Sequence, residues 1–352
     1  MDCTSSTIML DIERLFCVRD KIVLVTGGSR GIGEMIAGTF VAAGARVYIT
    51  ARNAAECEAT AHRLRGRGDC RALPADVADP QSVHLLVEEI RTREPRLDVL
   101  VNNAGIAWGA PLADYPLDAW DRVFAVNVRA MFQLTRDLLP QLKAGATAHD
   151  PSRVINLGSV AGMRVVQSTY AYAYGVSKAA VNHLTATLAM ELAASHVTVN
   201  AVSPGVFPSR MTEMRVGDRT MLEVAGATNP LGRPGSVEDI AGTCLYLASR
   251  AGAYLTGAVI PDRDRLGLPE GDQRAMDSRT RPSVDHQQHH GDDRQRDAIG
   301  IQPTDERVRL GREVRHVVDV RDRRVRCRAA WPWPPRTPRR SGRPRCGATP
   351  AG

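Results

Sequence analysis

The sequence predicts an α/β domain built on a doubly wound parallel sheet, and three observations indicate this fold class. Short apolar segments alternate with helix-forming segments from Lys21 onward. These segments are apolar throughout rather than at every second residue, and a glycine-rich turn follows the first of them. Strands of this kind are buried on both faces, because helices cover both sides of a parallel sheet.

The expected elements follow one another in a regular order. The first strand, 22–25, is a run of aliphatic residues that leads through the glycine turn into a helix ending near Ala43. The helix expected at 80–92 opens with a proline, which suits a first turn because the N–H that proline lacks has no partner there. Further strands are expected at 46–50, 70–75, 97–101, 154–157, 197–202 and 259–260, and further helices at 54–65, at 117–142 and from about Tyr174 to Ala194.

Composition divides the chain into three parts. Residues 1–20 form a short extension, 21–261 carry the alternating pattern of a single domain, and 262–352 form a tail with 21 arginines and no lysine. About one tail residue in eight is Leu, Ile, Val or Phe, too few to offset the chain entropy that folding costs. We therefore expect a disordered tail that is read out of frame or past the natural stop. The alternative is an arginine-rich arm that binds RNA or a membrane.

Charge and cysteine content exclude several classes of function for the domain. The net charge of +7 belongs to the tail, because residues 1–261 carry 25 Lys and Arg against 25 Asp and Glu. A neutral body argues against nucleic-acid binding, which requires a basic stripe. The seven cysteines are scattered without metal-ligand spacing, which indicates reduced thiols and no metal site. With no membrane-length apolar run and no signal-peptide pattern, we expect a soluble, cytoplasmic protein that does not bind membranes.

The turn after the first strand is typical of dinucleotide binding. It reads Thr26-Gly27-Gly28-Ser29-Arg30-Gly31-Ile32-Gly33, between a predicted strand and a predicted helix. Glycines at these spacings permit a tight turn, let a pyrophosphate approach the backbone and allow the helix to pack closely on the strand. Ligands of doubly wound sheets bind at the carboxyl ends of the strands, where this turn lies.

The end of the second strand indicates which dinucleotide binds. An NAD site places an acidic residue here for the ribose hydroxyls, whereas this chain has Arg52 and no carboxylate at the strand end. Arg30 in the glycine turn points to the same place, and two guanidinium groups favour the 2′-phosphate of NADP. The alternative is that Arg52 is an ordinary surface residue. Asp76 and Val77, after the third strand, are expected beside the adenine.

A tyrosine and a lysine predict the chemistry. Tyr174 and Lys178 are four residues apart, so they share one helix face, and a nearby ammonium is expected to lower the pKa of the phenol. Ser159 follows the fifth strand and can hold a carbonyl oxygen while Tyr174 protonates it. Asn127, in an apolar helix setting, is either a satisfied core amide or a residue that orients water behind Lys178. Taken alone, such a Tyr–Lys pair is more often a pair of surface neighbours.

Together these residues resemble the short-chain dehydrogenase/reductase family, a Rossmann-fold family, over about residues 21–261. The matching motifs are the 26–33 turn, Asn102-Asn103-Ala104-Gly105, Asn127, Ser159, Tyr174 with Lys178, and Pro204-Gly205. The segments 158–162, 172–175 and 207–212 are similar to the rhamnolipid-type 3-oxoacyl-(acyl-carrier-protein) reductases. The resemblance implies that Tyr174 is the general acid, Ser159 binds the substrate carbonyl, Lys178 holds the nicotinamide ribose, and Asn127 supports the proton relay. The cofactor-binding positions it implies, with those argued above, are Thr26, Gly27, Ser29, Arg30, Gly31, Ile32, Gly33, Arg52, Asp76, Val77, Asn103, Ala104, Gly105, Tyr174, Lys178, Pro204 and Gly205.

The same resemblance implies a substrate lid between Gly205 and about Asn229. Its apolar residues, together with Trp108, suggest an apolar pocket: Phe207, Met211, Met214, Met221 and Leu222. Members that bind an acyl carrier place arginines near the substrate entrance, where a rough alignment puts Asp150 and Ser195, so a coenzyme A thioester or a small ketone stays open beside a carrier-bound substrate.

The expected activity is therefore NADPH-dependent reduction of a 3-oxoacyl thioester or a related ketone. The alternatives are an NAD- or NADP-linked secondary-alcohol or sugar-acid dehydrogenase and an NADP-binding scaffold or sensor without turnover. The family usually closes its last strand with Asp-Gly-Gly, whereas this chain reads Asp262-Arg263-Asp264. Since that strand often joins subunits in the family, a homo-oligomer is expected unless the altered C-terminus prevents it.

Overall fold

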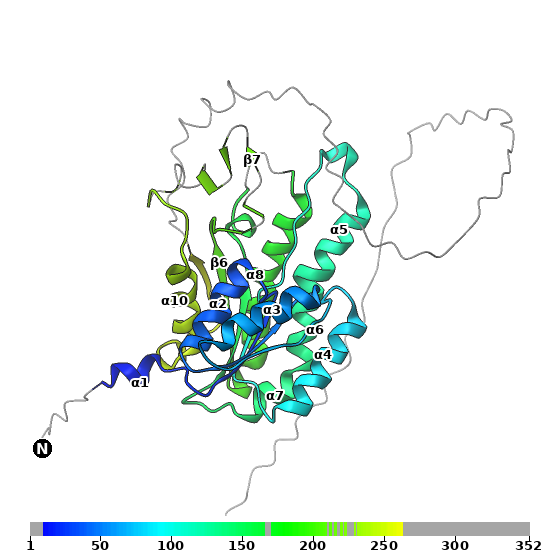
Figure 1. Cartoon of the computed structure of the whole chain (residues 1–352). Coiled ribbons are helices and arrows are strands. Elements are labelled where there is room, and N and C mark those ends of the chain that lie inside the picture. The colour runs from blue at the N-terminus through cyan, green and yellow to red at the C-terminus, as the bar shows by residue number, and fades with distance from the viewer. Residues whose placement is uncertain are drawn as a thin grey trace, which may run out of the picture. The chain divides into compact units, whose positions relative to one another are not determined.

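The computed structural model describes residues 10–165, 170–209, 211–212, 215–216, 219–220, 222–223, 229 and 231–262. The expectation of a disordered tail at 262–352 falls, apart from the backbone of Asp262, outside these described residues. Within them the predicted doubly wound parallel sheet is confirmed (Figure 1). None of the helices in this part of the chain combines the length and the hydropathy needed to cross a bilayer.

Seven parallel strands form the central sheet in the order β3-β2-β1-β4-β5-β6-β9. The order reverses between β1 and β4, which makes this the switch point of the sheet. The register places Thr26 opposite Thr50, Asn102 opposite Asn156, and Leu157 opposite Val202, so the carboxyl ends of the central strands line up. The strands are β1 (Ile22–Thr26), β2 (Arg46–Thr50), β3 (Cys70–Ala72), β4 (Val99–Asn102), β5 (Ser152–Leu157), β6 (Val197–Pro204) and β9 (Val259–Asp262), and a separate hairpin joins β7 (Arg215–Val216) to β8 (Arg219–Thr220).

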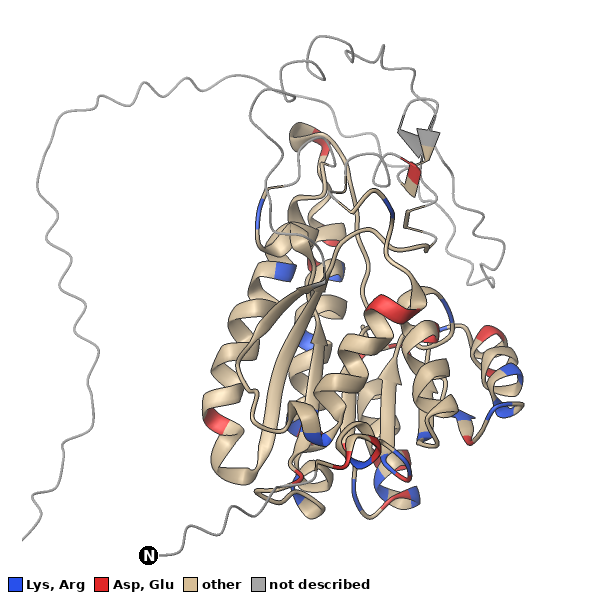
Figure 2. Ribbon diagram, turned by 90° about the vertical axis from the view of Figure 1, so that its left-hand side faces the viewer, with Lys and Arg blue, Asp and Glu red and all other residues tan. Residues whose placement is uncertain are grey.

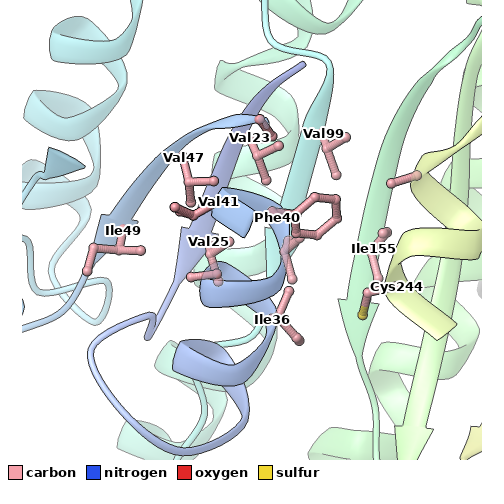
Figure 3. Packing of buried hydrophobic residues seen from close by; sticks show 14 of the residues in the cluster. Val23, Val25, Ile36, Phe40, Val41, Val47, Ile49, Val99, Ile155 and Cys244 are labelled. Carbon is pink, nitrogen blue, oxygen red and sulfur yellow. The ribbon is translucent and has the colours of Figure 1, made fainter. Parts of the chain in front are cut away.

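Helices cover both faces of the sheet, as the uniformly apolar strands require. On one face, Val23 and Val25 of β1 pack with Ile36 and Phe40 of α2 and with Cys244 of α10 (Figure 3). The alternate β1 residues pack on the other face, against α4, α6, α7 and α8. The helices are α1 (Ile12–Phe16), α2 (Gly31–Ala42), α3 (Ala54–Arg65), α4 (Pro80–Arg93), α5 (Leu117–Phe124), α6 (Ala130–Asp137), α7 (Leu139–Ala144), α8 (Tyr172–Leu192) and α10 (Val237–Ala248).

The single helix expected at 117–142 is wrong in detail. The structure divides it into α5, a π-helical segment η2 (Ala125–Arg129), α6 and α7. The π segment contains Asn127, whose amide bonds to groups outside the helix, and Leu138 leaves helical geometry just before Pro140 at the start of α7. Short 3-10 turns occur at η1 (Leu112–Asp114), η3 (Val160–Gly162), η4 (Ala193–Ser195) and η5 (Arg250–Gly252).

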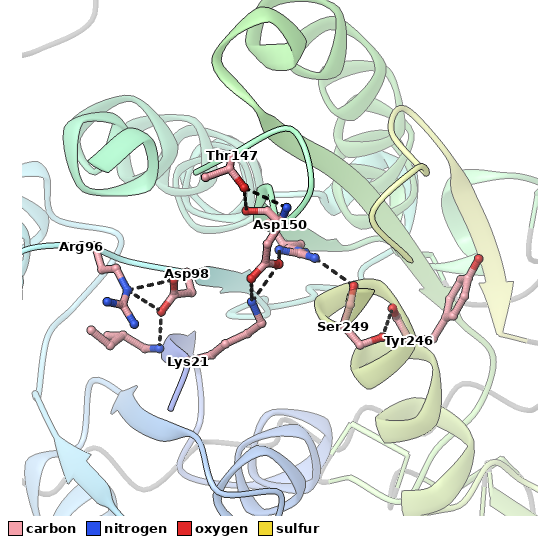
Figure 4. A network of polar contacts seen from close by, with 9 residues as sticks. Lys21, Arg96, Asp98, Thr147, Asp150, Tyr246 and Ser249 are labelled. Atoms are coloured by element: carbon pink, nitrogen blue, oxygen red, sulfur yellow. Dashed lines mark hydrogen bonds and ion pairs between the residues drawn. The ribbon is translucent and has the colours of Figure 1, made fainter. Parts of the chain in front are cut away.

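An ion-pair network lies at the amino ends of the strands (Figure 4). Lys21 Nζ donates to both oxygens of Asp150 at 2.9 and 3.0 Å, and Asp150 also pairs with Arg153. Arg153 is 1% exposed, and its Nη2 donates to the Ser249 carbonyl at 2.9 Å. Burial raises the pKa of Asp150, but the Lys21 hydrogen bond and the Arg153 charge outweigh it, so the pKa is lowered overall. Over the described residues, basic and acidic positions are interspersed (Figure 2).

Candidate functional site

Ser159 and Tyr174 meet at the carboxyl end of β5. Ser159 follows that strand and caps the turn η3, its Oγ accepting from the Ala161 N–H at 3.1 Å. The turn packs tightly against α8, because a Cβ on Gly162 would lie 2.6 Å from the backbone nitrogen of Ala179. This close approach brings the Ser159 hydroxyl near enough to the phenol of Tyr174, in the first turn of α8, to affect the pKa of that phenol.

The expected lowering of the Tyr174 pKa is wrong for this structure. Burial raises the pKa of the phenol above its ordinary value, and the hydrogen bond from Ser159 offsets this only in part. Burial has the larger effect because the phenolate loses more hydration than one hydroxyl returns. The phenol therefore keeps its proton at neutral pH, which is the form that a proton donor requires.

Lys178 lies one turn after Tyr174, as the spacing predicted. Its ammonium lies 5.8 Å from the centre of the Tyr174 ring and donates to the Leu157 carbonyl at 2.6 Å. The side chain is buried, and burial lowers its pKa from 10.5 to about 8. An amine with this pKa is still mostly charged at pH 7, so it contributes a positive charge beneath the phenol.

Asn127 is fully buried, and its amide ties two other segments to the π segment. Its Nδ2 donates to the Ile106 carbonyl at 3.0 Å and to Ser177 Oγ at 2.9 Å, while its Oδ1 accepts from the Ile106 N–H at 2.9 Å. Ser177 in turn donates to the Tyr174 carbonyl at 2.7 Å. Sequence reasoning missed Ser177, although its position directly before Lys178 was a signal. These bonds connect the loop after β4 to the first two turns of α8.

The glycine turn has the close packing that its spacing predicted. Gly27 and Gly31 have positive φ angles of 64° and 54°, where a side chain is strained. A Cβ on Gly33 would lie 2.8 Å from the Gly27 carbonyl carbon, closer than real Cβ atoms come. Asn103 Nδ2 donates to the Thr26 and Gly27 carbonyls at 2.8 and 3.1 Å, so this amide fixes the turn. The exposed backbone of such a turn fits a pyrophosphate.

The other expected cofactor positions surround the same strand ends. Thr26 Oγ1 accepts from the Asn103 and Ala104 N–H groups, both at 3.0 Å. Val77 is buried and lines a small cavity with Thr26 and Ala104, while the Asp76 carboxylate accepts from the Ala78 N–H at 2.9 Å. The remaining positions are at the end of β6 (Pro204, Gly205), in the glycine turn (Ser29, Ile32) and in the loop after β4 (Gly105).

The two arginines expected at a 2′-phosphate lie at adjacent element starts. Arg30 is the N-terminal flanking residue of α2, and Arg52 is exposed between β2 and α3. Arg30 Nη1 pairs with Glu56, at 3.2 Å to Oε2 and 3.4 Å to Oε1. Sequence reasoning missed Glu56, because the acid lies in the first turn of α3 rather than at the strand end.

The expected substrate pocket is only partly supported. Phe207 is 3% exposed and packs in the core beneath Gly235, so its assignment to the pocket is wrong. Met211 and Trp108 are exposed at 39% and 51%, and Leu222 is partly buried. Met214 and Met221 lie outside the described residues.

Asp150 and Ser195 do not lie at this chain's own site entrance. Asp150 precedes β5 and Ser195 precedes β6, whereas Ser159 follows β5, so the sheet separates the two ends.

A glycine turn at the switch point and a Ser–Tyr–Lys cluster at the same strand ends define a dinucleotide-dependent oxidoreductase of the α/β class. The family model described as "Enoyl-(Acyl carrier protein) reductase" matches residues 27–261. The chain belongs to this family, within the short-chain dehydrogenases/reductases.

The domain of this chain matches nearly the whole length of its curated relatives. The rhamnolipids biosynthesis 3-oxoacyl-[acyl-carrier-protein] reductase of Pseudomonas aeruginosa is 48% identical over 246 residues, which are 70% of this chain and 96% of that protein. The galactitol 2-dehydrogenase (L-tagatose-forming) of Cereibacter sphaeroides is 34% identical over 71% of this chain and 96% of its own. The solved Pseudomonas aeruginosa RhlG/NADP active-site complex has a TM-score of 0.68 at 48% identity, and covers 70% of this chain and 96% of its own.

Proposed function

We propose that the protein is an NADPH-dependent ketoreductase that converts a 3-oxoacyl thioester or a related ketone to the hydroxy product. The observation that carries this proposal is that the Ser159 hydroxyl lies close enough to the Tyr174 phenol to affect its pKa, with the buried ammonium of Lys178 one helical turn away. Two hydroxyls that meet at one point can hold a single carbonyl oxygen between them. The reductase name of the 48% identical relative supports the same substrate class.

The chain's own residues provide binding, orientation and a proton. The Ser159 hydroxyl donates to the substrate carbonyl oxygen, and the Tyr174 phenol gives its proton to that oxygen as negative charge develops there. The raised pKa of Tyr174 keeps the proton in place until then. Lys178 stabilises the phenolate that remains, and Asn127 holds the catalytic turn of α8 through Ser177. NADPH, when bound, supplies the hydride.

The cofactor assignment rests on residues at the carboxyl ends of β1 and β2. Arg30 and Arg52 offer guanidinium groups to a 2′-phosphate, and the sequence from Thr50 to Asn53 has no carboxylate to hold a free ribose 2′-hydroxyl. The solved relative from Pseudomonas aeruginosa is a complex with NADP, which supports this assignment. Residues 21–261 would form the catalytic domain, since the family match ends at 261.

The type of substrate separates the proposed thioester reductase from the alternative, a sugar or secondary-alcohol dehydrogenase. The relative from Pseudomonas aeruginosa is named for an acyl-carrier-protein substrate, whereas the relative from Cereibacter sphaeroides is named for a sugar alcohol. We propose a cytoplasmic homo-oligomer acting on a thioester. Size-exclusion chromatography with light scattering of the full chain tests the assembly.

The activity test uses NADPH oxidation by the full chain, with 3-oxoacyl groups on coenzyme A and on acyl carrier protein. A 2-enoyl thioester and, with NADP⁺, galactitol serve as alternative substrates. Tyr174→Phe is expected to lower kcat by about 10²-fold to 10⁴-fold, the usual effect of removing a general acid, while NADPH binding is retained. Tyr172→Phe is the matched control, since Tyr172 lies two residues away and contacts the Tyr115 ring instead. Full activity in Tyr174→Phe would refute the acid assignment, and turnover of the enoyl or sugar substrate alone would refute ketone reduction.

A further inference from the structure

A cavity of about 610 Å³ opens along the outer side of α2, away from Ser159. It extends from the N-terminal end of α2 to the far end of α3, and its lining includes Arg30, Met35, Gly38, Glu56, Leu64 and Arg67. Arg30 therefore lies at the edge where this cavity meets the glycine turn. The same guanidinium is the one proposed above for the 2′-phosphate of NADP.

The Arg30–Glu56 ion pair is formed on one side of the guanidinium. Nη1 alone contacts the carboxylate, at 3.2 and 3.4 Å, rather than two nitrogens meeting two oxygens in a fork. The side chains are 51% and 25% exposed, so water screens the pair and competes for both groups. A pair without the fork lacks the added energy and geometric specificity of a bidentate one, so another anion can compete with Glu56 for Arg30.

Glu56 also occupies a position that favours anions. It lies in the first turn of the 12-residue helix α3, whose flanking residue Asn53 accepts from the Glu56 N–H at 3.0 Å. The amino end of a helix carries a partial positive charge, and Arg52 adds a full one directly before it. A 2′-phosphate held by Arg30 and Arg52 would thus come close to the Glu56 carboxylate.

We propose that Glu56 is a specificity-determining residue, which weakens the preference for NADP over NAD by competing with the 2′-phosphate for Arg30. This inference rests on the proposed function, because it assumes the NADP site. A cofactor without the 2′-phosphate leaves the Arg30–Glu56 pair undisturbed, whereas the 2′-phosphate of NADP competes with Glu56 for the same guanidinium and is repelled by the nearby carboxylate. The energetic penalty therefore falls on NADP alone. If Glu56 instead served to orient Arg30, its removal would weaken NADP binding.

The test is the ratio of the NADH to the NADPH dissociation constant, measured on the full chain by nicotinamide fluorescence. Glu56→Gln is expected to raise this ratio roughly threefold to tenfold. The substitution removes the repulsion between the Glu56 carboxylate and a doubly charged phosphate, and water screens that repulsion to a modest energy. The increase should become smaller between about 0.05 and 0.5 M salt, because the interaction is electrostatic. Calorimetry with adenosine 2′,5′-bisphosphate and with ADP measures the same contrast without a nicotinamide.

Glu34→Gln is the matched control. Glu34 lines the same cavity in the first turn of α2, but its carboxylate pairs with Arg63 at 2.6 Å rather than with Arg30. It removes the same charge from the same region, so a general field effect would change both variants alike. Thermal unfolding of both variants checks that the fold is retained.

The outcomes separate this proposal from the proposed function. A wild-type protein that binds NADPH no tighter than NADH contradicts the cofactor assignment itself. A wild-type preference that Glu56→Gln leaves unchanged or lowers, or that Glu34→Gln raises equally, overturns the role of Glu56 only. A selective increase in Glu56→Gln that declines with salt supports it.

Discussion

Gly33→Ala is expected to destabilise the domain and to distort the glycine turn proposed to bind the dinucleotide. The added Cβ would lie 2.8 Å from the Gly27 carbonyl carbon and closer still to the Gly27 oxygen and the Asn103 amide. Neither Gly27 backbone atom is the end of a flexible side chain, so α2 must shift away from the turn after β1. Relief at the Gly27 oxygen requires a shift of roughly 1 Å, and forcing an extra methyl into packed structure costs about 1–3 kcal/mol.

Gly242→Ala makes the same chemical change where nothing opposes it. Gly242 is exposed in α10, and a Cβ there would meet no atom within 4 Å. Alanine is favoured over glycine in a helix by about 0.5–1 kcal/mol, so this variant is expected to be more stable than the wild type. The two substitutions should therefore change stability in opposite directions.

The assay is urea unfolding of both variants, together with NADPH titration. For a domain of this size, 1 kcal/mol corresponds to a melting-temperature change of about 2–4 °C, which scanning calorimetry also resolves. Gly33→Ala should lower NADPH affinity at least tenfold, a loss of about 1.4 kcal/mol, while Gly242→Ala should leave it unchanged. Equal stability of the Gly33→Ala and wild-type proteins, with normal NADPH binding, would refute the close packing of the turn.

Two further substitutions test the electrostatics at either end of the sheet. Lys178→Met should end turnover. It should also raise the free energy of unfolding at pH 7 by about 1–3 kcal/mol, because burial lowers the pKa of Lys178 from 10.5 in the unfolded chain to about 8 in the folded protein. This advantage should shrink from pH 8 to 10.5, where the wild-type amine is neutral when folded but still charged when unfolded; urea melts at pH 7 and 10 measure it, and a variant less stable at both contradicts the assignment. Asp150→Ala leaves Arg153, 1% exposed, without its carboxylate and should cost about 2–3 kcal/mol, with kcat/KM nearly unchanged. Since the Asp150 pKa is lowered, this loss should be largest above the ordinary Asp pKa and fade in acid; an equal loss at pH 7 and pH 3 would argue against it.

Pattern and spacing predicted the order and type of the sheet elements well. Uniformly apolar strands, the glycine turn and the four-residue spacing of Tyr174 and Lys178 are local signals. In the structure the strands form one sheet, with the glycine turn at the carboxyl end of β1. Helix α10 carried a local signal that was not used, a capping box formed by Ser236 and Asp239.

The features that the sequence did not predict depend on contacts between residues far apart in the chain. The π segment exists where Asn127 meets Ile106 and Ser177, at separations of 21 and 50 residues. The direction of the Tyr174 pKa shift depends on how deeply the folded chain buries the phenol, which spacing to Lys178 does not specify. Phe207 has an apolar side chain that would suit a pocket, but its packing against Gly235 in the folded chain places it in the core.

The Lys21–Asp150–Arg153 network and the Ser159–Tyr174 pair occupy opposite rims of the same strands. Stability and the proposed chemistry thus depend on residues at opposite ends of the strands, about the length of β5 apart. Substitutions at the amino ends of the strands can therefore be used to raise thermal stability, and substitutions at the carboxyl ends to change the ketone that is accepted. Neither kind of change alters the residues at the opposite end.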